Sequence, residues 1–132
     1  DNELLRYRFL NKWDIDLNEL ETQYHWLSAL PGYVTKKHES EKVICFERAN
    51  CIFIFNFHAS NSLTEYPVGI RQPGRYKIGL NSDDPIYEGH GRLDNDQIYF
   101  TSGGKMVDDQ VQSITLYLPS RTCLVLVKIE EE

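Results

Sequence analysis

Three groups of side chains in this sequence could do chemistry: the histidines, the acidic residues of polar stretches and the tyrosines beside turns. The histidines are His25, His38, His58 and His90, and none has a second His or a Cys at the spacing of a zinc site. Ser60 and Ser62 follow His58, but no serine lies in a G-x-S-x-G sequence, so a triad would rest on geometry alone. The SGGK sequence at 102–105 lacks the spacing of a phosphate-binding loop. These patterns predict no metal site and no cofactor.

The acidic side chains of the second half are the next candidates, because two carboxylates about 5–10 Å apart can cleave a glycosidic bond. They are Asp83, Asp84, Glu88, Asp94, Asp96, Asp108 and Asp109. All of them lie in polar, turn-like stretches, where a solvated carboxylate is the simpler interpretation. Calcium binding by the NSDD sequence at 81–84 has little support, since the EF-hand pattern and its glycine are missing. A hydrolase built on these loop acids is therefore the least favoured hypothesis.

Tyrosines beside predicted turns are candidates for sugar binding, because an aromatic ring packs well against the apolar face of a pyranose. Tyr66, Tyr87 and Tyr99 occupy such places, and packing in a core is the alternative for each of them. His90 lies between two glycines in the sequence EGHGRLD, either as a ligand contact or in a turn that needs their positive φ. We take Tyr66, Tyr87 and His90 as the candidate sugar-binding residues.

Length and charge limit the classes of function. A chain of 132 residues fits one domain with a single core, and its net charge is −6. An acidic chain is a poor partner for nucleic acid or for an anionic membrane surface, so neither is expected. No run approaches 18 apolar residues, and the sequence therefore predicts no transmembrane helix.

The cysteines are odd in number and favour a reducing compartment. Cys45, Cys51 and Cys123 all lie in strand-like runs, which predicts buried thiols. A Cys45–Cys51 disulfide is the rival interpretation. If the two strands pair around Ala49-Asn50, Cys45 lies opposite Ile54, and this register argues against the bridge.

The chain is predicted to begin with a helical segment over residues 1–30. Its apolar stripe recurs at alternating steps of four and three residues: Trp13, Leu17, Leu20, Tyr24 and Leu27. Asn11 is expected to separate an earlier, shorter helix, and Asp16 to cap the second helix. Pro31-Gly32 then ends helical structure.

The rest of the chain, residues 31–132, is predicted to be all β. Short strand-like runs are separated by turn sequences, and these runs are YVTKKH, KVICFER, CIFIFNF, YPVGI, RYKIGL, QIYF, SITLYL and CLVLVKI. No helical pattern lies between them, so a parallel sheet is not expected. The pattern predicts an antiparallel β-sandwich with Greek-key links, preceded by the N-terminal helical segment.

The run CIFIFNF at 51–57 carries large apolar residues on both faces. Cys51, Phe53, Phe55 and Phe57 share one face, and Ile52, Ile54, Asn56 and His58 share the other. A strand that is apolar on both faces is central and covered on both sides. We expect Asn56 and His58, at the end of this strand, to make structural hydrogen bonds rather than to form an active site.

Four stretches cover most of the chain in order: LRYRFLNKWDIDLNELETQYHWL, KVICFERANCIFIFNFH, EYPVGIRQPGRYKIGLNSDDPIYEGHGRLD and LYLPSRTCLVL. Together they resemble one family, the 1,4-α-glucan (glycogen and starch) branching enzymes of the α-amylase superfamily. They contain the family's F-N-F-H, P-G-x-Y-K-I, G-H-x-R-L-D and P-S-R motifs in order, over nearly the whole chain. Ala59 stands where the family commonly has Pro, and Asn50 where Gly is usual. Asn tolerates a left-handed turn, so the hairpin is expected to survive.

The resemblance implies an enzyme that cuts an α-1,4 bond and passes the cut chain, through a covalent glycosyl-enzyme, to a 6-hydroxyl. In this family the catalytic Asp and Glu lie on a (β/α)8 barrel. This sequence resembles only the last helix of the barrel with the helix that follows, residues 1–30, and the C-terminal all-β domain, residues 31–132. The resemblance thus implies that this chain holds no catalytic residue.

The resulting hypothesis is a non-catalytic C-terminal domain that braces the barrel of a branching enzyme in the cytoplasm. The barrel is the expected partner, contacted through Phe9, Trp13 and Trp26, and an α-glucan is the second candidate partner. The alternative is an independent α-glucan-binding module that uses Tyr66, Tyr87 and His90.

Overall fold

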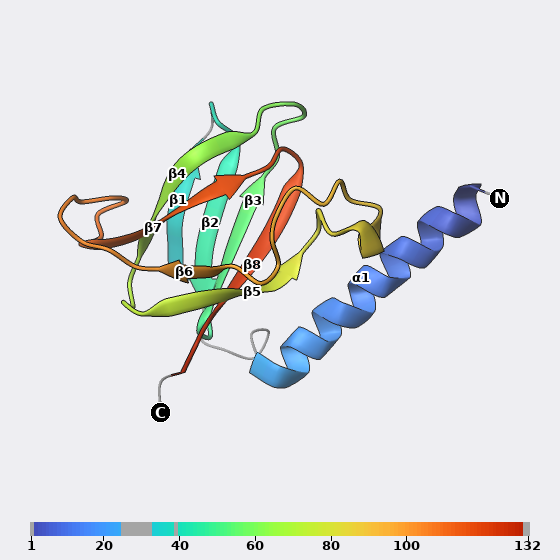
Figure 1. Ribbon diagram of the computed structural model, residues 1–132, viewed down its shortest axis with the longest axis horizontal. Coiled ribbons are helices and arrows are strands. Elements are labelled where there is room, and N and C mark those ends of the chain that lie inside the picture. Colours follow the sequence, from blue (N-terminus) through green and yellow to red (C-terminus); the bar gives the residue numbers. More distant parts are fainter. Residues whose placement is uncertain (1, 25–32, 39, 131–132) are drawn as a thin grey trace.

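The computed structural model describes residues 2–24, 33–38 and 40–130 of the chain. One long helix precedes eight strands and a short 3-10 helix within these residues (Figure 1). In chain order they are α1 (Asn2–Tyr24), β1 (Tyr33–His38), β2 (Val43–Arg48), β3 (Cys51–Asn56), β4 (Leu63–Ile70), β5 (Arg75–Asn81), η1 (Pro85–Tyr87), β6 (Ile98–Phe100), β7 (Gln112–Leu118) and β8 (Thr122–Lys128).

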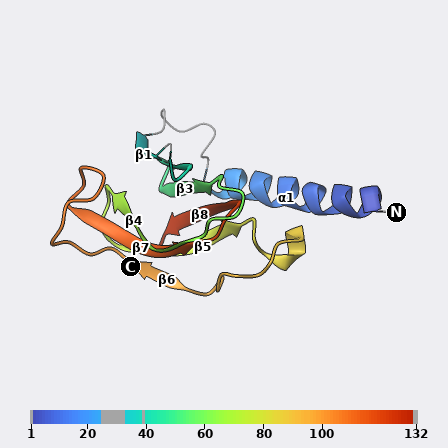
Figure 2. The same cartoon turned by 90° about the horizontal axis from the view of Figure 1, so that it is seen from above.

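The strands form two antiparallel sheets. The larger sheet has the order β1-β2-β3-β8-β5-β6, and the smaller one pairs β4 with β7. The last strand, β8, therefore lies between β3 and β5, which joins the beginning and the end of the β domain. Figure 2 shows the layers from above, and in both views the N-terminal turns of α1 project beyond the strands. No helix among the described residues combines the length and the apolar character that crossing a membrane requires.

The larger sheet is covered on both faces along β3 and β8. Residues between the two sheets form the first cluster: Val43, Cys45, Ile52, Ile54, Tyr66, Val68, Ile70, Tyr76, Tyr99, Ile114, Leu116, Leu118, Leu124 and Leu126. The opposite face carries a second cluster of Leu20, Cys51, Phe53, Leu80, Val125 and Val127. Alternate residues of β3 enter different clusters, so the predicted two-faced central strand is confirmed.

Helix α1 is held over the second face by Leu20, which is 6% exposed. Its side chain reaches the sheet above Gly79, where a Cβ would lie 3.4 Å from Leu20 Cδ1 and 2.6 Å from Val127 Cγ2. The glycine in the middle of β5 therefore leaves room for the Val127 side chain of β8, whereas the distance to Leu20 would be an ordinary van der Waals contact.

The predicted sandwich, its strands and the hairpin register are confirmed. Cys45 lies opposite Ile54, and no disulfide joins the three cysteines. Ala49 and Asn50 have φ values of 54° and 45°. Two left-handed residues in succession are the requirement of a tight two-residue hairpin turn, and Asn accepts this conformation at low cost.

The prediction of two helices was wrong. Asn11 lies inside α1, which runs without a break, and Asp16 accepts a 3.0 Å hydrogen bond from Lys12 one turn earlier instead of capping a helix. Neither Gly nor Pro occurs between residues 2 and 24, and Asn costs a helix interior less than about 0.7 kcal/mol. The expected stop at Pro31-Gly32 and the boundary at residue 30 lie outside the described residues.

The two-faced core leads to a stability prediction for Ile54, which is fully buried between the sheets. We expect Ile54→Ala to lower the free energy of unfolding by about 2–5 kcal/mol, because the cavity that it leaves cannot fully collapse. Ile86→Ala, at a side chain that is 49% exposed, is the matched control and should change it by less than about 0.5 kcal/mol. Urea denaturation measures both values, and equal losses would contradict this core.

Candidate functional site

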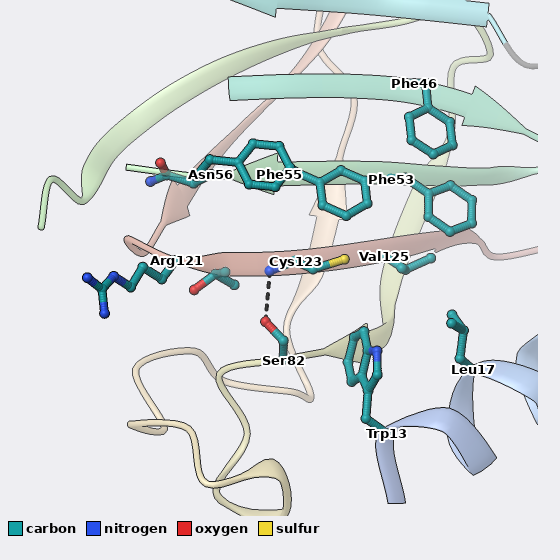
Figure 3. A pocket seen from close by; sticks show the side chains of 12 residues that line it. Trp13, Leu17, Phe46, Phe53, Phe55, Asn56, Ser82, Arg121, Cys123 and Val125 are labelled. Carbon is teal, nitrogen blue, oxygen red and sulfur yellow. Dashed lines mark hydrogen bonds between the residues drawn. The ribbon is translucent and has the colours of Figure 1, made fainter. Parts of the chain in front are cut away.

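An apolar groove lies between α1 and the second face of the larger sheet (Figure 3). Its volume is about 550 Å³. The described residues that line it are Trp13, Leu17, Phe46, Phe53, Phe55, Asn56, Phe57, Ser82, Arg121, Thr122, Cys123 and Val125. They come from α1, from β2, β3 and β8, and from turns at one end of these strands, so the groove depends on the tertiary fold.

One wall of the groove is a row of four phenylalanines, 46, 53, 55 and 57, which we call the phenylalanine row. The stacked pairs have ring centroids 4.8 Å apart for Phe46–Phe53, 5.9 Å for Phe46–Phe55 and 5.5 Å for Phe55–Phe57. The row exists because alternate residues of β3 point to one face, while Phe46 is the register partner of Phe53. Phe57 ends the row and leaves 59% of its surface exposed.

The opposite wall is the apolar stripe of α1, in which Trp13 and Leu17 face the sheet (Figure 3). The Trp13 ring meets Tyr87 edge-on, with centroids 5.0 Å apart. The Tyr87 hydroxyl donates a hydrogen bond to Asp16 of the same helix. Burial and this acceptor carboxylate raise the pKa of Tyr87 above its ordinary value of 10.0, so the phenol stays protonated and keeps donating. The η1 segment thereby fixes α1 beside the groove.

The three residues predicted to contact the barrel lie in different surroundings. Trp13 lines the groove while packing on its own domain, and Phe9 lines a smaller recess of about 330 Å³ together with Leu10, Trp13 and Tyr87. Trp26 lies outside the described residues. Contact with a barrel remains a prediction for all three.

The polar residues at the end of β3 are committed to structural hydrogen bonds. Asn56 is 1% exposed, and its Nδ2 lies 3.1–3.2 Å from the carbonyl oxygens of Asn61, Leu118 and Pro119. Its Oδ1 accepts from the backbone N–H of His58. His58 Nδ1 in turn accepts from the backbone N–H groups of Ser60 and Asn61, at 3.2 and 2.9 Å. This confirms the structural role that we predicted for both residues.

The thiol in the groove is chemically inert. Burial raises the pKa of Cys123 to about 12, so the thiolate that a nucleophile needs does not form near neutral pH. The backbone N–H of the same residue donates to Ser82 Oγ at 2.8 Å, the contact drawn in Figure 3. No Asp or Glu occurs among the described residues of the groove wall. The groove is suited to apolar contact and lacks the carboxylate pair of a glycosidase.

The sugar-binding candidates do not all reach the surface. Tyr66 is 6% exposed and Tyr99 is 3% exposed, both within the cluster between the two sheets. Neither ring offers a face to a sugar, and Tyr66 is therefore dropped as a candidate. The position of a tyrosine beside a turn does not predict whether its ring points into the core or toward solvent.

Tyr87 and His90 both line a polar recess of about 270 Å³ next to the groove. It is lined by Ala59, Ser82, Asp83, Tyr87, Glu88, Gly89, His90, Arg92, Ser120 and Arg121. His90 and Glu88 are exposed there, whereas Tyr87 is half-buried against α1.

Asp83, one of the predicted loop acids, is bound by an arginine. Its two oxygens accept from the Arg92 side chain at 2.8 Å (Nη2) and 3.1 Å (Nε), and also from the backbone N–H groups of His90 and Arg92. Burial raises the pKa of Asp83, but these hydrogen bonds outweigh it, and the net pKa lies below the ordinary 3.8. Arg92 Nη2 also donates to the Ser120 carbonyl at 3.0 Å, which ties the loop to the β7–β8 turn.

Two other acids from the predicted loops also accept hydrogen bonds from backbone N–H groups. Asp84 Oδ1 accepts from the backbone N–H of Ile86 and caps η1, while Asp108 Oδ2 accepts from the backbone N–H of Gly69 at 2.8 Å. In the part of the chain that the structure describes, no group of three His, Cys, Asp or Glu side chains is placed to hold a metal ion.

Comparison with known proteins places the β domain in a family. Residues 33–128 match the family model described as alpha amylase, C-terminal all-beta domain. The chain is 47% identical over 130 residues to a 1,4-alpha-glucan-branching enzyme of Equus caballus, 45% to that of Felis catus and 44% to that of Dictyostelium discoideum. Each match covers 98% of this chain but only 18%, 18% and 19% of the relative.

The Asp83–Arg92 pair leads to a prediction on pH. Because the folded pKa of Asp83 is depressed, its contribution to stability is complete above the ordinary value of 3.8 and is lost as pH falls through the folded pKa. At pH 7 Asp83→Asn should lower the free energy of unfolding by about 1–3 kcal/mol, through lost charged hydrogen bonds. That difference from the unmodified chain should shrink toward pH 3 in urea titrations.

The control for this prediction is Asp96→Asn, at an exposed carboxylate of the same segment. It should change the free energy of unfolding by less than about 0.5 kcal/mol at either pH. If Asp83→Asn lost the same amount at pH 3 as at pH 7, the ion pair would not be the cause.

Proposed function

The chain belongs to the family of alpha amylase C-terminal all-beta domains, and from this we propose that it is the non-catalytic C-terminal domain of a 1,4-α-glucan branching enzyme. The observation that carries the proposal is the match itself. Three relatives with this name align with nearly the whole chain, yet the chain spans less than a fifth of their length. The cutting of an α-1,4 bond and the transfer of the cut glucan chain to a 6-hydroxyl are assigned to the larger, unmatched part.

The chemistry of the described residues supports this division of labour. The carboxylates of Asp83, Asp84 and Asp108 accept hydrogen bonds from backbone N–H groups of turns and loops. The groove offers apolar walls and an inert thiol. A domain of this kind contributes by covering apolar surface of a neighbouring domain, and each large side chain fully buried there contributes about 1.5–3 kcal/mol. The three cysteines without a disulfide support a reducing compartment, which we propose to be the cytoplasm.

Activity assays of the chain and of the full-length protein test this proposal. We expect residues 1–132 alone to leave amylose unchanged in iodine staining and in the content of α-1,6 linkages. The full-length protein should introduce such linkages under the same conditions. Branching by the chain alone above a buffer control would refute the non-catalytic role, and an inactive full-length protein would refute the assignment to a branching enzyme.

A second candidate function is contact with an α-glucan at the polar recess. One observation favours it: Tyr87 and His90, chosen from the sequence as separate candidates, line the same recess beside Glu88 and Arg121. Planar polar side chains next to an aromatic ring are the usual means of binding a sugar.

Amide NMR shifts during a titration with maltoheptaose test this second function. Shifts at Gly89 and Gly91 are expected at millimolar sugar, and His90→Ala should abolish them without changing the fold, because its side chain is exposed. His38→Ala, on β1, is the control and should leave the titration unchanged. The absence of any shift at millimolar sugar would remove this candidate.

A further inference from the structure

The turn that follows β3 is held by the ring of His58. Its Nδ1 atom accepts from the backbone N–H groups of Ser60 and Asn61, at 3.2 and 2.9 Å. A ring nitrogen that accepts a hydrogen bond carries no proton, so the neutral imidazole has its proton on Nε2. Protonation of Nδ1 would direct a third N–H group toward these two. The hydrogen-bonded turn at residues 58–61 therefore requires a neutral ring.

This turn forms one side of the polar recess. Ala59 lines the recess directly, and the His58 carbonyl accepts from the backbone N–H of Arg121, which lines it from the β7–β8 turn. Just after the first turn, Ser62 Oγ accepts from the backbone N–H of Ser120, a third lining residue, at 3.0 Å. The two turns lie side by side at one end of the strands (Figure 1). The turn held by the histidine ring therefore helps to position three of the lining residues.

The other contacts of the turn do not titrate and do not favour a charged ring. Asn56 Oδ1 accepts from the His58 N–H at 3.0 Å, and Asn56 Nδ2 donates to the Asn61 carbonyl at 3.1 Å. Within the described ranges, the bonds of the His58 ring are those to backbone N–H groups, and no carboxylate is among its partners. The charged residues in backbone contact with the end of β3 and this turn are Lys42 and Arg121, both cationic. A positive charge on the ring would therefore gain no partner here.

The recess contains other titratable side chains, whose effects must be separated from that of His58. Asp83 stays ionised above its ordinary pKa of 3.8, because its folded pKa is lower still, and Tyr87 stays protonated near neutral pH because its pKa lies above 10.0. The two arginines of the recess stay charged. Glu88 and His90 are exposed and can change charge directly. Any effect of these two groups persists when only position 58 is changed.

We propose that His58 is a pH switch for the polar recess: its neutral ring closes the turn, and protonation opens the turn and displaces Ala59 and Arg121. Imidazole is the side chain that ordinarily changes charge between pH 5 and 8. The closed turn excludes the proton that the open turn accepts, so acidification favours the open turn and a higher pH favours the closed one. The consequence for sugar rests on the second candidate function above, whereas the switch itself does not.

A substitution that keeps the acceptor but cannot titrate tests the switch. In His58→Asn the side-chain oxygen takes nearly the place of Nδ1, and Asn commonly accepts from backbone N–H groups two and three residues ahead. His38→Asn, on β1, is the matched control, since it removes a histidine from another part of the fold. In the chain of residues 1–132, amide NMR shifts of Ala59, Asn61 and Arg121 are followed from about pH 7.5 to about pH 5, the range in which imidazole titrates.

We expect the three amides to shift together with the His58 ring in the unmodified chain and in His38→Asn, and to stay in place in His58→Asn. Ring nitrogen shifts should show the His58 proton on Nε2 at the higher pH. The proposal is overturned if the amides keep their shifts while the ring takes up a proton. It is also overturned if they move equally in His58→Asn, or if the neutral ring carries its proton on Nδ1.

Titrations with maltoheptaose at both pH values test the consequence for the recess. The affinity should fall roughly three- to tenfold at the lower pH, which corresponds to the loss of one or two hydrogen bonds, and should be equal at both pH values in His58→Asn. A pH dependence that persists in His58→Asn would belong to His90 or Glu88 and would refute control by His58. No sugar-induced shift at either pH would refute the second candidate function, while amide shifts measured without sugar would still support the switch.

Discussion

Both faces of β3 are apolar, and the layers on either side of the larger sheet follow from this. The chain covers the two faces by different means, and the cover is complete between the sheets but only partial on the face beside α1, where Phe55 is half-buried. Ile52 and Ile54 pack under the small β4–β7 sheet, while Cys51 and Phe53 pack under α1. Pairing of β3 with β8 places the C-terminal strand in the same centre, so both ends of the domain contribute to one core.

Several polar residues that resemble catalytic groups are structural. Where the chain leaves β3, the side chains of Asn56 and His58 bind backbone groups of the following turn and of the β7–β8 turn. Asp83 and Arg92 do the equivalent work where the chain crosses from β5 to β6, by joining that segment to the β7–β8 turn. In both places a buried side chain, Asn56 or Asp83, makes several hydrogen bonds within the fold.

Much of the fold could be predicted from the sequence, because strand alternation and turn residues are local signals. The Ala49-Asn50 turn fixed the register that places Cys45 opposite Ile54. The continuity of α1 was missed because Asn11 was given the weight of a helix breaker, although it carries only a small propensity cost. For Tyr66 the sequence left sugar binding and core packing open, and the structure favours the core; a register shift lies between Leu63 and Tyr66, which local sequence does not predict.

The groove itself was half visible in the sequence. The sequence predicts that Phe53, Phe55 and Phe57 share one face and that the stripe of α1 is apolar. It does not predict that the helix packs beside this face, because that depends on the tertiary structure. A single helix about 10–12 Å across cannot cover the whole width of strands spaced 4.7–4.9 Å apart, so a six-stranded sheet with one helix on that face leaves aromatic surface over. Phe57, at the end of the phenylalanine row, accordingly keeps 59% of its surface exposed.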